Sequence, residues 1–271
     1  MNPTLENLAP GVYAWLHGTN SHSNTNSGLV IASDGLTVID AGPTPAAAKD
    51  FAHEISLLTD IPVKRLVFTS SHIAAVGGGR AFPLAGIYGT GQTSDHLDQE
   101  PNPDTWARLH PQHDFTDVTT RPVSHTVAEA AHLCAASIAV PIGGPQFENL
   151  VVQVPSANVV FGGSALSFGT VPLGFEADVP TWIASLNQMR EWGEVFVPGH
   201  GPVGGVEELQ ELTNYLEAIT EAKGNPGAVA TGPWDGWADS HFTPVNVERA
   251  WMLSQGDPSP PPSMLALLGL Q

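Results

Sequence analysis

The sequence predicts an α+β protein built as an αββα sandwich, with two packed mixed β-sheets and helices on the outer faces. Three observations support this. The first third of the chain is rich in short strands, a second strand-rich run follows after residue 131, and each run is followed by helical patterns. The expected strands cover 11–18, 27–33, 35–42, 63–70, 86–90, 132–144, 148–156 and 157–166, and 194–205 is expected to be a strand followed by a loop that holds His200.

Turn and capping signals fix several boundaries. Asp34-Gly35 separates two apolar runs and predicts a hairpin. A second hairpin turn is expected over 155–158. Thr44 followed by Pro45 predicts the start of a helix that carries Phe51, Ile55 and Leu58 on one face. Further helices are expected over 179–193 and 206–224.

The chain divides into a main domain over 1–224 and a tail over 225–271. The tail contains Trp234, Trp237 and Trp251, so we expect part of it to pack on the domain or on a neighbouring subunit. The polar segment 92–125, with a short helix near Trp106 and His110, is either a lid over a site or a surface excursion.

Composition excludes some functions. The chain has 9 basic and 27 acidic residues and a net charge of −18, which disfavours binding to nucleic acid or to an anionic membrane. The beginning of the sequence lacks a signal-peptide pattern, and no apolar run reaches membrane-spanning length, so a cytoplasmic location is expected. The single Cys134 excludes an intrachain disulfide.

The stretch 68–79, FTSSHIAAVGGG, has the outline of a metal-binding loop at the end of a strand. Its glycines at 77–79 are expected to allow a close approach of a helix start to the sheet. With three other pieces in the same order, this stretch resembles the metallo-β-lactamase fold superfamily over about residues 12–215. The pieces are NSGLVIASDGLTVIDAG (26–42), LVFTSSHIAAVGGG (66–79), NLVVQVPSANVVFGGSAL (149–166) and VFVPGHGPVGG (195–205). NVERAWML (246–253) adds a weak likeness to quinoprotein-associated hydrolases.

The resemblance implies a zinc site at the strand ends, in which bound water attacks an ester, lactone or amide carbonyl. The family's motif His-x-His-x-Asp-His matches this chain only at His72, because its other ligand positions fall on Ser70, Ala74 and Ala75. The family's next ligand, a histidine shortly before the strand at 149, is absent because no histidine lies between His132 and His200, and the bridging aspartate falls on Ser164.

The last ligand of the family is present as His200, so the dinuclear site is expected to be lost. At most one divalent metal, zinc, is expected, on His72, His200 and His22. Asp40, Glu176 and Asp178 are further candidates for a rescuing ligand.

Without a metal, catalysis would rest on His72, His200, Ser71, Ser164 and Asp40, for example through a serine–histidine pair. The structural alternatives are backbone contacts for both histidines and a turn-organising role for Asp40. His53, His96 and His132 are interpreted as structural.

Three functions remain open for the cleft. The favoured one is a hydrolase-like enzyme acting on a small ester, lactone, amide or related molecule. The others are a non-catalytic small-molecule-binding protein and a scaffold retained for protein contacts, with oligomer formation compatible with each.

Overall fold

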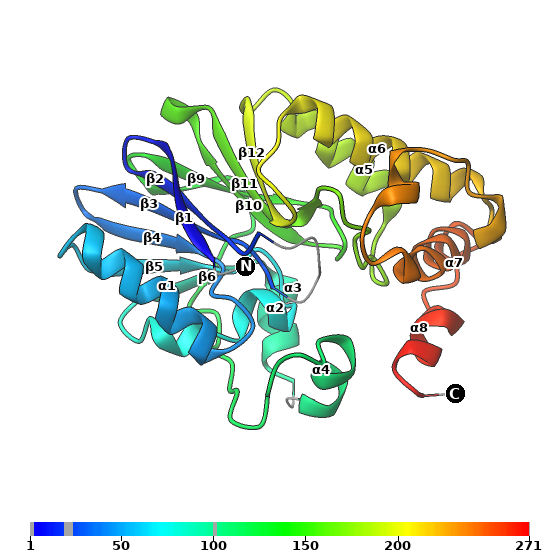
Figure 1. Cartoon of the computed structure of the whole chain (residues 1–271), viewed down its shortest axis with the longest axis horizontal. Helices are drawn as coiled ribbons and strands as arrows, with labels where there is room; N and C mark the ends of the chain where they lie inside the picture. Colours follow the sequence, from blue (N-terminus) through cyan, green and yellow to red (C-terminus); the bar gives the residue numbers. More distant parts are fainter. Residues whose placement is uncertain (1–2, 19–23, 100–101, 271) are drawn as a thin grey trace.

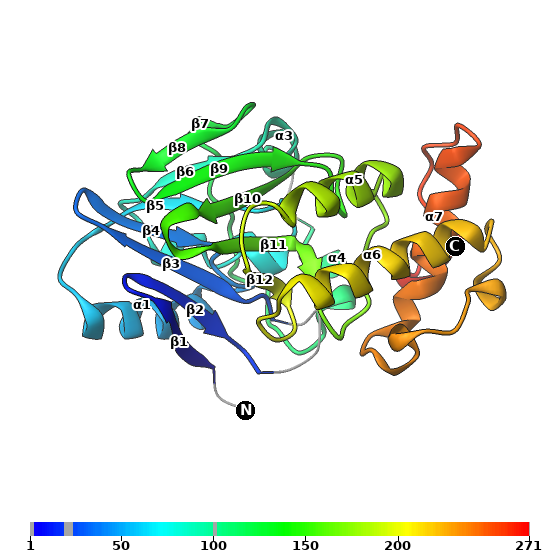
Figure 2. The same ribbon diagram turned by 90° about the horizontal axis from the view of Figure 1, so that it is seen from above.

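Two β-sheets pack face to face, and helices lie on their outer surfaces (Figures 1 and 2). The computed structural model describes residues 3–18, 24–99 and 102–270. In these residues the first sheet has seven strands in chain order: β1 (Thr4–Ala9), β2 (Val12–Leu16), β3 (Ser27–Ala32), β4 (Gly35–Ile39), β5 (Val63–Val67), β6 (Gly86–Gly89) and β7 (His125–Thr126).

The second sheet has five strands, in the order β12 (Val195–His200), β11 (Val159–Ser167), β10 (Asn149–Val154), β9 (Ser137–Ile142) and β8 (Ala131–Cys134). Both sheets are mixed. Strands β1 to β4 pair antiparallel and β4 to β7 parallel, while β8 to β11 pair antiparallel and β11 with β12 parallel. The predicted α+β sandwich is confirmed.

Both predicted hairpins are present. The first has its turn one residue earlier than predicted: Ala32 pairs with Gly35 across a turn at Ser33 and Asp34, and Gly35, with a φ of 138°, begins β4. Between β10 and β11 the chain makes a short 3₁₀ turn, which Asn158 closes in a left-handed conformation with φ of 53°. Asparagine tolerates this region better than most side chains.

Helix α1 (Pro45–Leu58) covers the outer face of the first sheet. Its N-cap is the predicted Thr44, whose side chain accepts a hydrogen bond from the N–H of Ala47 at 3.2 Å. Phe51 and Ile55 pack against the sheet. Leu58 does not, since it is 43% exposed.

Helices α5 (Val179–Met189) and α6 (Val206–Glu221) cover the outer face of the second sheet (Figure 1). Apolar side chains at helical spacing on both helices join one core with the alternate residues of the strands. The core includes Val151, Val160, Trp182, Leu186, Phe196, Leu212 and Leu216.

A third apolar cluster fills the space between the sheets. It takes the opposite set of alternate side chains from each strand, as the two-residue period of a strand requires. Its members include Val30, Ile39, Val67, Leu150, Val152, Phe161 and Val197.

The remaining helices are shorter or lie near the C-terminus. α2 (Ile73–Val76), α3 (Gly91–Leu97) and α4 (Pro103–Leu109) follow β5 and β6, and α7 (Thr243–Ser254) and α8 (Pro262–Leu267) lie beyond α6. Val245, Val247 and Met264 from this last part belong to the same core as α6. No helix in the described ranges has both the length and the apolar character that crossing a membrane requires.

Gly77 and Gly78 bring the end of α2 against the loop that follows β4. Gly78 N–H donates to the carbonyl of Gly42 at 2.8 Å, and Ala41 N–H donates to the carbonyl of Ala75 at 2.7 Å. A Cβ atom on Gly78 would lie 2.1 Å from the carbonyl oxygen of Ala41. The glycines do make a close approach, but it joins the end of α2 to the loop after β4 rather than a helix start to the sheet.

We therefore expect Gly78→Ala to lower the free energy of unfolding by about 1–3 kcal/mol, because the loop must move to admit the methyl group. Chemical denaturation measures the change. Gly236→Ala is the control, since a Cβ there meets no described atom within 4 Å. Equal stability of the two variants would contradict the close approach.

Candidate functional site

Thr69, two residues after β5, joins the ends of strands from both sheets. Its N–H and hydroxyl donate to the two carboxyl oxygens of Asp40, at 2.8 Å and 2.7 Å. Its carbonyl accepts from Leu150 N–H at 2.9 Å and from Asn149 Nδ2 at 3.2 Å. Its hydroxyl oxygen also accepts from Ser164 N–H at 3.2 Å. We call this set of contacts the Thr69 junction.

A cavity of about 180 Å³ lies beside the Thr69 junction, at the ends of the strands. Ser164 lines it, and its hydroxyl lies 2.7 Å from that of Ser70. One wall is largely apolar. The lining residues are Thr25, Ser71, His72, Ile73, Ala74, His96, Thr105, Trp106, Leu109, His110, Gln146, Ser164, Leu173, Phe175, Glu176 and His200.

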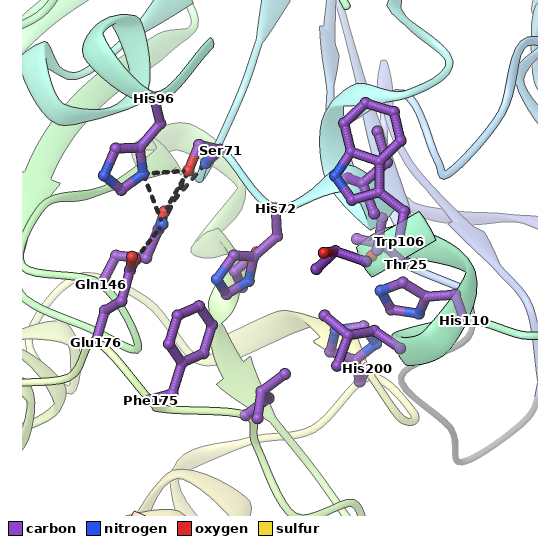
Figure 3. A pocket seen from close by; sticks show the side chains of 16 residues that line it. Thr25, Ser71, His72, His96, Trp106, His110, Gln146, Phe175, Glu176 and His200 are labelled. Carbon is purple, nitrogen blue, oxygen red and sulfur yellow. Dashed lines mark hydrogen bonds between the residues drawn. The ribbon is translucent and has the colours of Figure 1, made fainter. Parts of the chain in front are cut away.

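Four imidazoles line this cavity, and three of them come from the segments next to α2, α4 and β12 (Figure 3). His72 precedes α2, His110 follows α4, and His200 ends β12. His200 Nδ1 lies 3.3 Å from the carbonyl oxygen of Asn24, so this ring nitrogen can donate to it.

His72 has an unsatisfied polar atom in the cavity wall. Its Nε2 atom is buried and makes no hydrogen bond with a described residue, and its ring stacks on Phe175 at 6.2 Å between centroids. Burial lowers the pKa of His72, and the nearby charge of Glu176 opposes part of that effect. The imidazole is therefore neutral at neutral pH.

Ser71 and His96 form a second polar group in the same cavity (Figure 3). The Ser71 hydroxyl oxygen lies 2.9 Å from His96 Nδ1. Gln146 holds Ser71 from two sides, since its Nε2 donates to Ser71 Oγ at 2.8 Å and its Oε1 accepts from Ser71 N–H at 3.1 Å. Glu176 in turn accepts from Gln146 Nε2 at 2.7 Å.

The Ser71 hydroxyl has two acceptors within reach. His96 Nδ1 lies 2.9 Å from its oxygen, and the amide oxygen of Gln146 lies at 3.2 Å. Gln146 Nε2 also lies 3.3 Å from His96 Nδ1. In the tautomer that carries its proton on Nε2, His96 offers Nδ1 as the nearer acceptor. The result is a serine hydroxyl hydrogen-bonded to an imidazole that can accept its proton.

Comparison with known proteins identifies the fold. No protein-family model matches the chain. A type 2 metallo-β-lactamase from Bacteroides fragilis is 28% identical over 125 residues, which span 43% of this chain and 46% of that protein, less than half its length. The FIM-1 metallo-β-lactamase from Pseudomonas aeruginosa, solved in its mono-zinc form, superposes with a TM-score of 0.63 and 18% identity, covering 80% of this chain and 96% of that one.

The chain has the metallo-β-lactamase fold. A stereoselective inverting sec-alkylsulfatase from Pseudomonas sp. also superposes, with a TM-score of 0.71 and 15% identity over 94% of this chain and 50% of that chain. Identities at this level establish the fold alone. The fold that the order of the sequence motifs implies is confirmed.

The described side chains do not form the zinc centre that the metallo-β-lactamase fold implies. Among residues 3–18, 24–99 and 102–270, no group of three or more His, Cys, Asp or Glu side chains could hold a metal ion. Zinc sites in proteins use at least three protein ligands. His22, the predicted third ligand, lies outside the described residues, so its role stays a prediction.

The other predicted site residues fall into two groups. His72, His200, Ser71 and Ser164 all line the cavity. Asp40 does not, because it is fully buried at the Thr69 junction. Of the further candidate ligands, Glu176 lines the cavity, and Asp178 caps α5 through Thr181 N–H.

The sequence did not predict two of the side chains that contact Ser71, His96 and Gln146. His96 was interpreted as a structural residue on a helix face, yet α3 carries it to Ser71. Gln146 lies in the segment before β10, where the resemblance implies a histidine ligand that this chain lacks. The missing histidine was the signal in the sequence that could have directed attention to Gln146. His110 was assigned only to a lid or surface segment, and it reaches the cavity.

Asp40 should control the pH dependence of stability. Burial raises its pKa to about 7, although the two hydrogen bonds from Thr69 oppose the shift. Between its ordinary pKa of 3.8 and about 7, the folded chain holds a proton that the unfolded chain has released. The free energy of unfolding is therefore higher at low pH, and it falls as the pH rises through this window.

We expect Asp40→Asn to remove the pH-dependent part of the free energy of unfolding that Asp40 causes. At about 1.4 kcal/mol per pKa unit, this part amounts to a few kcal/mol across the window. The amide keeps an acceptor for Thr69 N–H, and asparagine tolerates the φ of 55° at this position. Denaturant unfolding of both proteins between pH 4.5 and 7.5 should give a difference that changes with pH. Parallel curves would show that Asp40 is not protonated in the folded chain.

Proposed function

We propose that this protein is a hydrolase-like enzyme that cleaves a small ester, lactone, amide or related molecule through Ser71 and His96, without a dinuclear zinc centre. The observation that carries the proposal is the 2.9 Å contact between Ser71 Oγ and His96 Nδ1 in the wall of a cavity. The metallo-β-lactamase and alkylsulfatase relatives support hydrolytic chemistry on this fold.

Ser71 is the nucleophile in this proposal. As its oxygen bonds to the carbonyl carbon of the substrate, its proton passes to His96 Nδ1. His96 then gives that proton to the departing group, and the acyl group remains on Ser71. A water molecule, deprotonated by the same nitrogen, attacks the acyl carbon. As the bond to Ser71 Oγ breaks, His96 Nδ1 returns that proton to Oγ, so the acid is released, the pair is restored and one water is consumed in each cycle.

Gln146 and Glu176 are positioning residues. The Gln146 side chain fixes Ser71 through both its amide nitrogen and its amide oxygen. Because Glu176 accepts from Gln146 Nε2, the amide nitrogen is held beside Ser71 Oγ and the amide oxygen beside Ser71 N–H. This order directs the hydroxyl proton to His96, as a serine nucleophile requires.

His72 supplies a donor for the carbonyl oxygen. A neutral imidazole with its proton on Nε2 can donate one hydrogen bond, and this atom has no partner among the described residues. A donor that stabilises the developing oxyanion in a buried site contributes strongly to the rate. The assignment gives the predicted His72 a role that requires no metal.

We expect Ser71→Ala and His96→Ala each to lower kcat/KM on 4-nitrophenyl acetate by about 10²-fold or more, because either change removes the proton-transfer pair. Ser164→Ala is the matched control. Ser164 lines the same cavity, but its hydroxyl contacts Ser70, so a change of only a few-fold is expected.

Activity of the unmodified protein, purified without a histidine tag, should be unchanged after extensive treatment with a metal chelator. A loss of activity that zinc restores would favour a single metal on His72 and His200 instead. Equal activity of Ser71→Ala and the unmodified protein would overturn the proposal and leave a non-catalytic binding role.

A further inference from the structure

A second cavity lies against the Ser71–His96 pair, on the side of the C-terminal helices. Its volume is about 270 Å³. It shares His96, Phe175 and Glu176 with the first cavity, so a ligand that occupies both would lie across the proposed catalytic pair. The lining residues are Gln92, His96, Phe147, Phe175, Glu176, Arg249, Pro258 and Pro260.

Arg249, on α7, is the cationic side chain in this lining. It is only 3% exposed. Its Nε donates to the carbonyl of Ala177 and its Nη1 to the carbonyl of Pro258, both at 3.2 Å. The guanidinium carbon lies 5.6 Å from the centroid of the Phe147 ring. These contacts hold the group in one orientation.

The guanidinium keeps unused donors. A guanidinium carries five N–H groups, and the two carbonyls take two of them. Nη2 makes no hydrogen bond with a described residue, and it is not among the buried atoms that lack a partner, so it retains contact with the solvent. Arg249 therefore presents one N–H on Nη1 and two on Nη2.

Acidic side chains lie near the positive charge of Arg249, but none of the described ones forms an ion pair with it. Glu176, Asp178 and Asp257 lie near enough to oppose the lowering of the Arg249 pKa that burial causes. Arg249 nevertheless forms no ion pair with a described residue. In a chain with 9 basic and 27 acidic residues, a cation this well buried and this firmly held is unusual.

We infer that this second cavity binds the carboxylate of a small ligand through Arg249, and that the substrate of the Ser71–His96 pair is a small ester or amide that carries a carboxylate. The planar fork of a guanidinium matches the two oxygens of a carboxylate. The three neighbouring acids favour a singly charged group over the doubly charged phosphate. The substrate part of this inference rests on the proposed function, while the binding part does not.

The binding part is tested on the unmodified protein by calorimetry with benzoate, benzamide and inorganic phosphate. We expect benzoate to bind at least about ten-fold more tightly than its neutral isostere benzamide, and phosphate to bind more weakly than benzoate. The affinity for benzoate should fall as salt is added. Equal affinity for benzoate and benzamide, or preference for phosphate, would overturn the inference.

Arg249→Met should weaken benzoate binding about ten-fold or more, and Arg249→Lys should weaken it less because the positive charge remains. The exposed Arg80→Met is the control for loss of one positive charge and should bind benzoate normally. Circular dichroism and thermal unfolding establish that each variant is folded. If Arg249→Met does not fold, the comparison of benzoate with benzamide still decides the point.

The substrate part is tested with mono-4-nitrophenyl succinate and the neutral 4-nitrophenyl butyrate. We expect kcat/KM to favour the succinate at least about ten-fold, and Arg249→Met to remove that preference. Ser71→Ala separates the two proposals. If it keeps both benzoate binding and full hydrolysis, the proposed function fails and the carboxylate site stands. If hydrolysis depends on Ser71 while the succinate gains nothing, the substrate inference fails.

Discussion

The hydrogen bonds of Thr69 are the constraint on which the rest of the site depends. One residue at the end of β5 contacts Asp40 after β4, Asn149 and Leu150 at the start of β10, and Ser164 on β11. These bonds are buried, and losing any of them would leave a polar group without a partner at the seam between the sheets. The junction therefore fixes how the two halves of the chain meet, and with it the position of Ser71.

The resemblance to the metallo-β-lactamase fold implies a metal at this seam, with ligands at positions that here carry Ser70, Ala74, Ala75 and Ser164. Ala74 and Ser164 line the cavity, whose polar contacts are organised around an amide, Gln146. Serine and imidazole chemistry can use this arrangement, whereas zinc requires donors that the described residues do not bring together.

Much of the fold could be predicted because it depends on local signals such as strand alternation, the Asp34–Gly35 turn and the Thr44 cap. His72 and His200 could be placed from motif positions. The Ser71–His96 contact could not, because β6 lies between the two residues, and α3 is too short for periodicity to show which side faces inward. Arg249 lies in a helix whose pattern gave no reason to bury a charge. Its burial depends on the carbonyls of Ala177 and Pro258, which only the tertiary structure brings there.

The two cavities draw their walls from both sheets and from α7, and this has a thermodynamic consequence. A ligand that binds only the folded chain stabilises it by RT ln(1 + [L]/Kd), about 2.7 kcal/mol at a hundred-fold excess over Kd. Since the walls separate when the chain unfolds, the melting temperature of the protein responds to occupancy. Ligands can then be ranked by the melting temperature of the protein in their presence, before any turnover is observed.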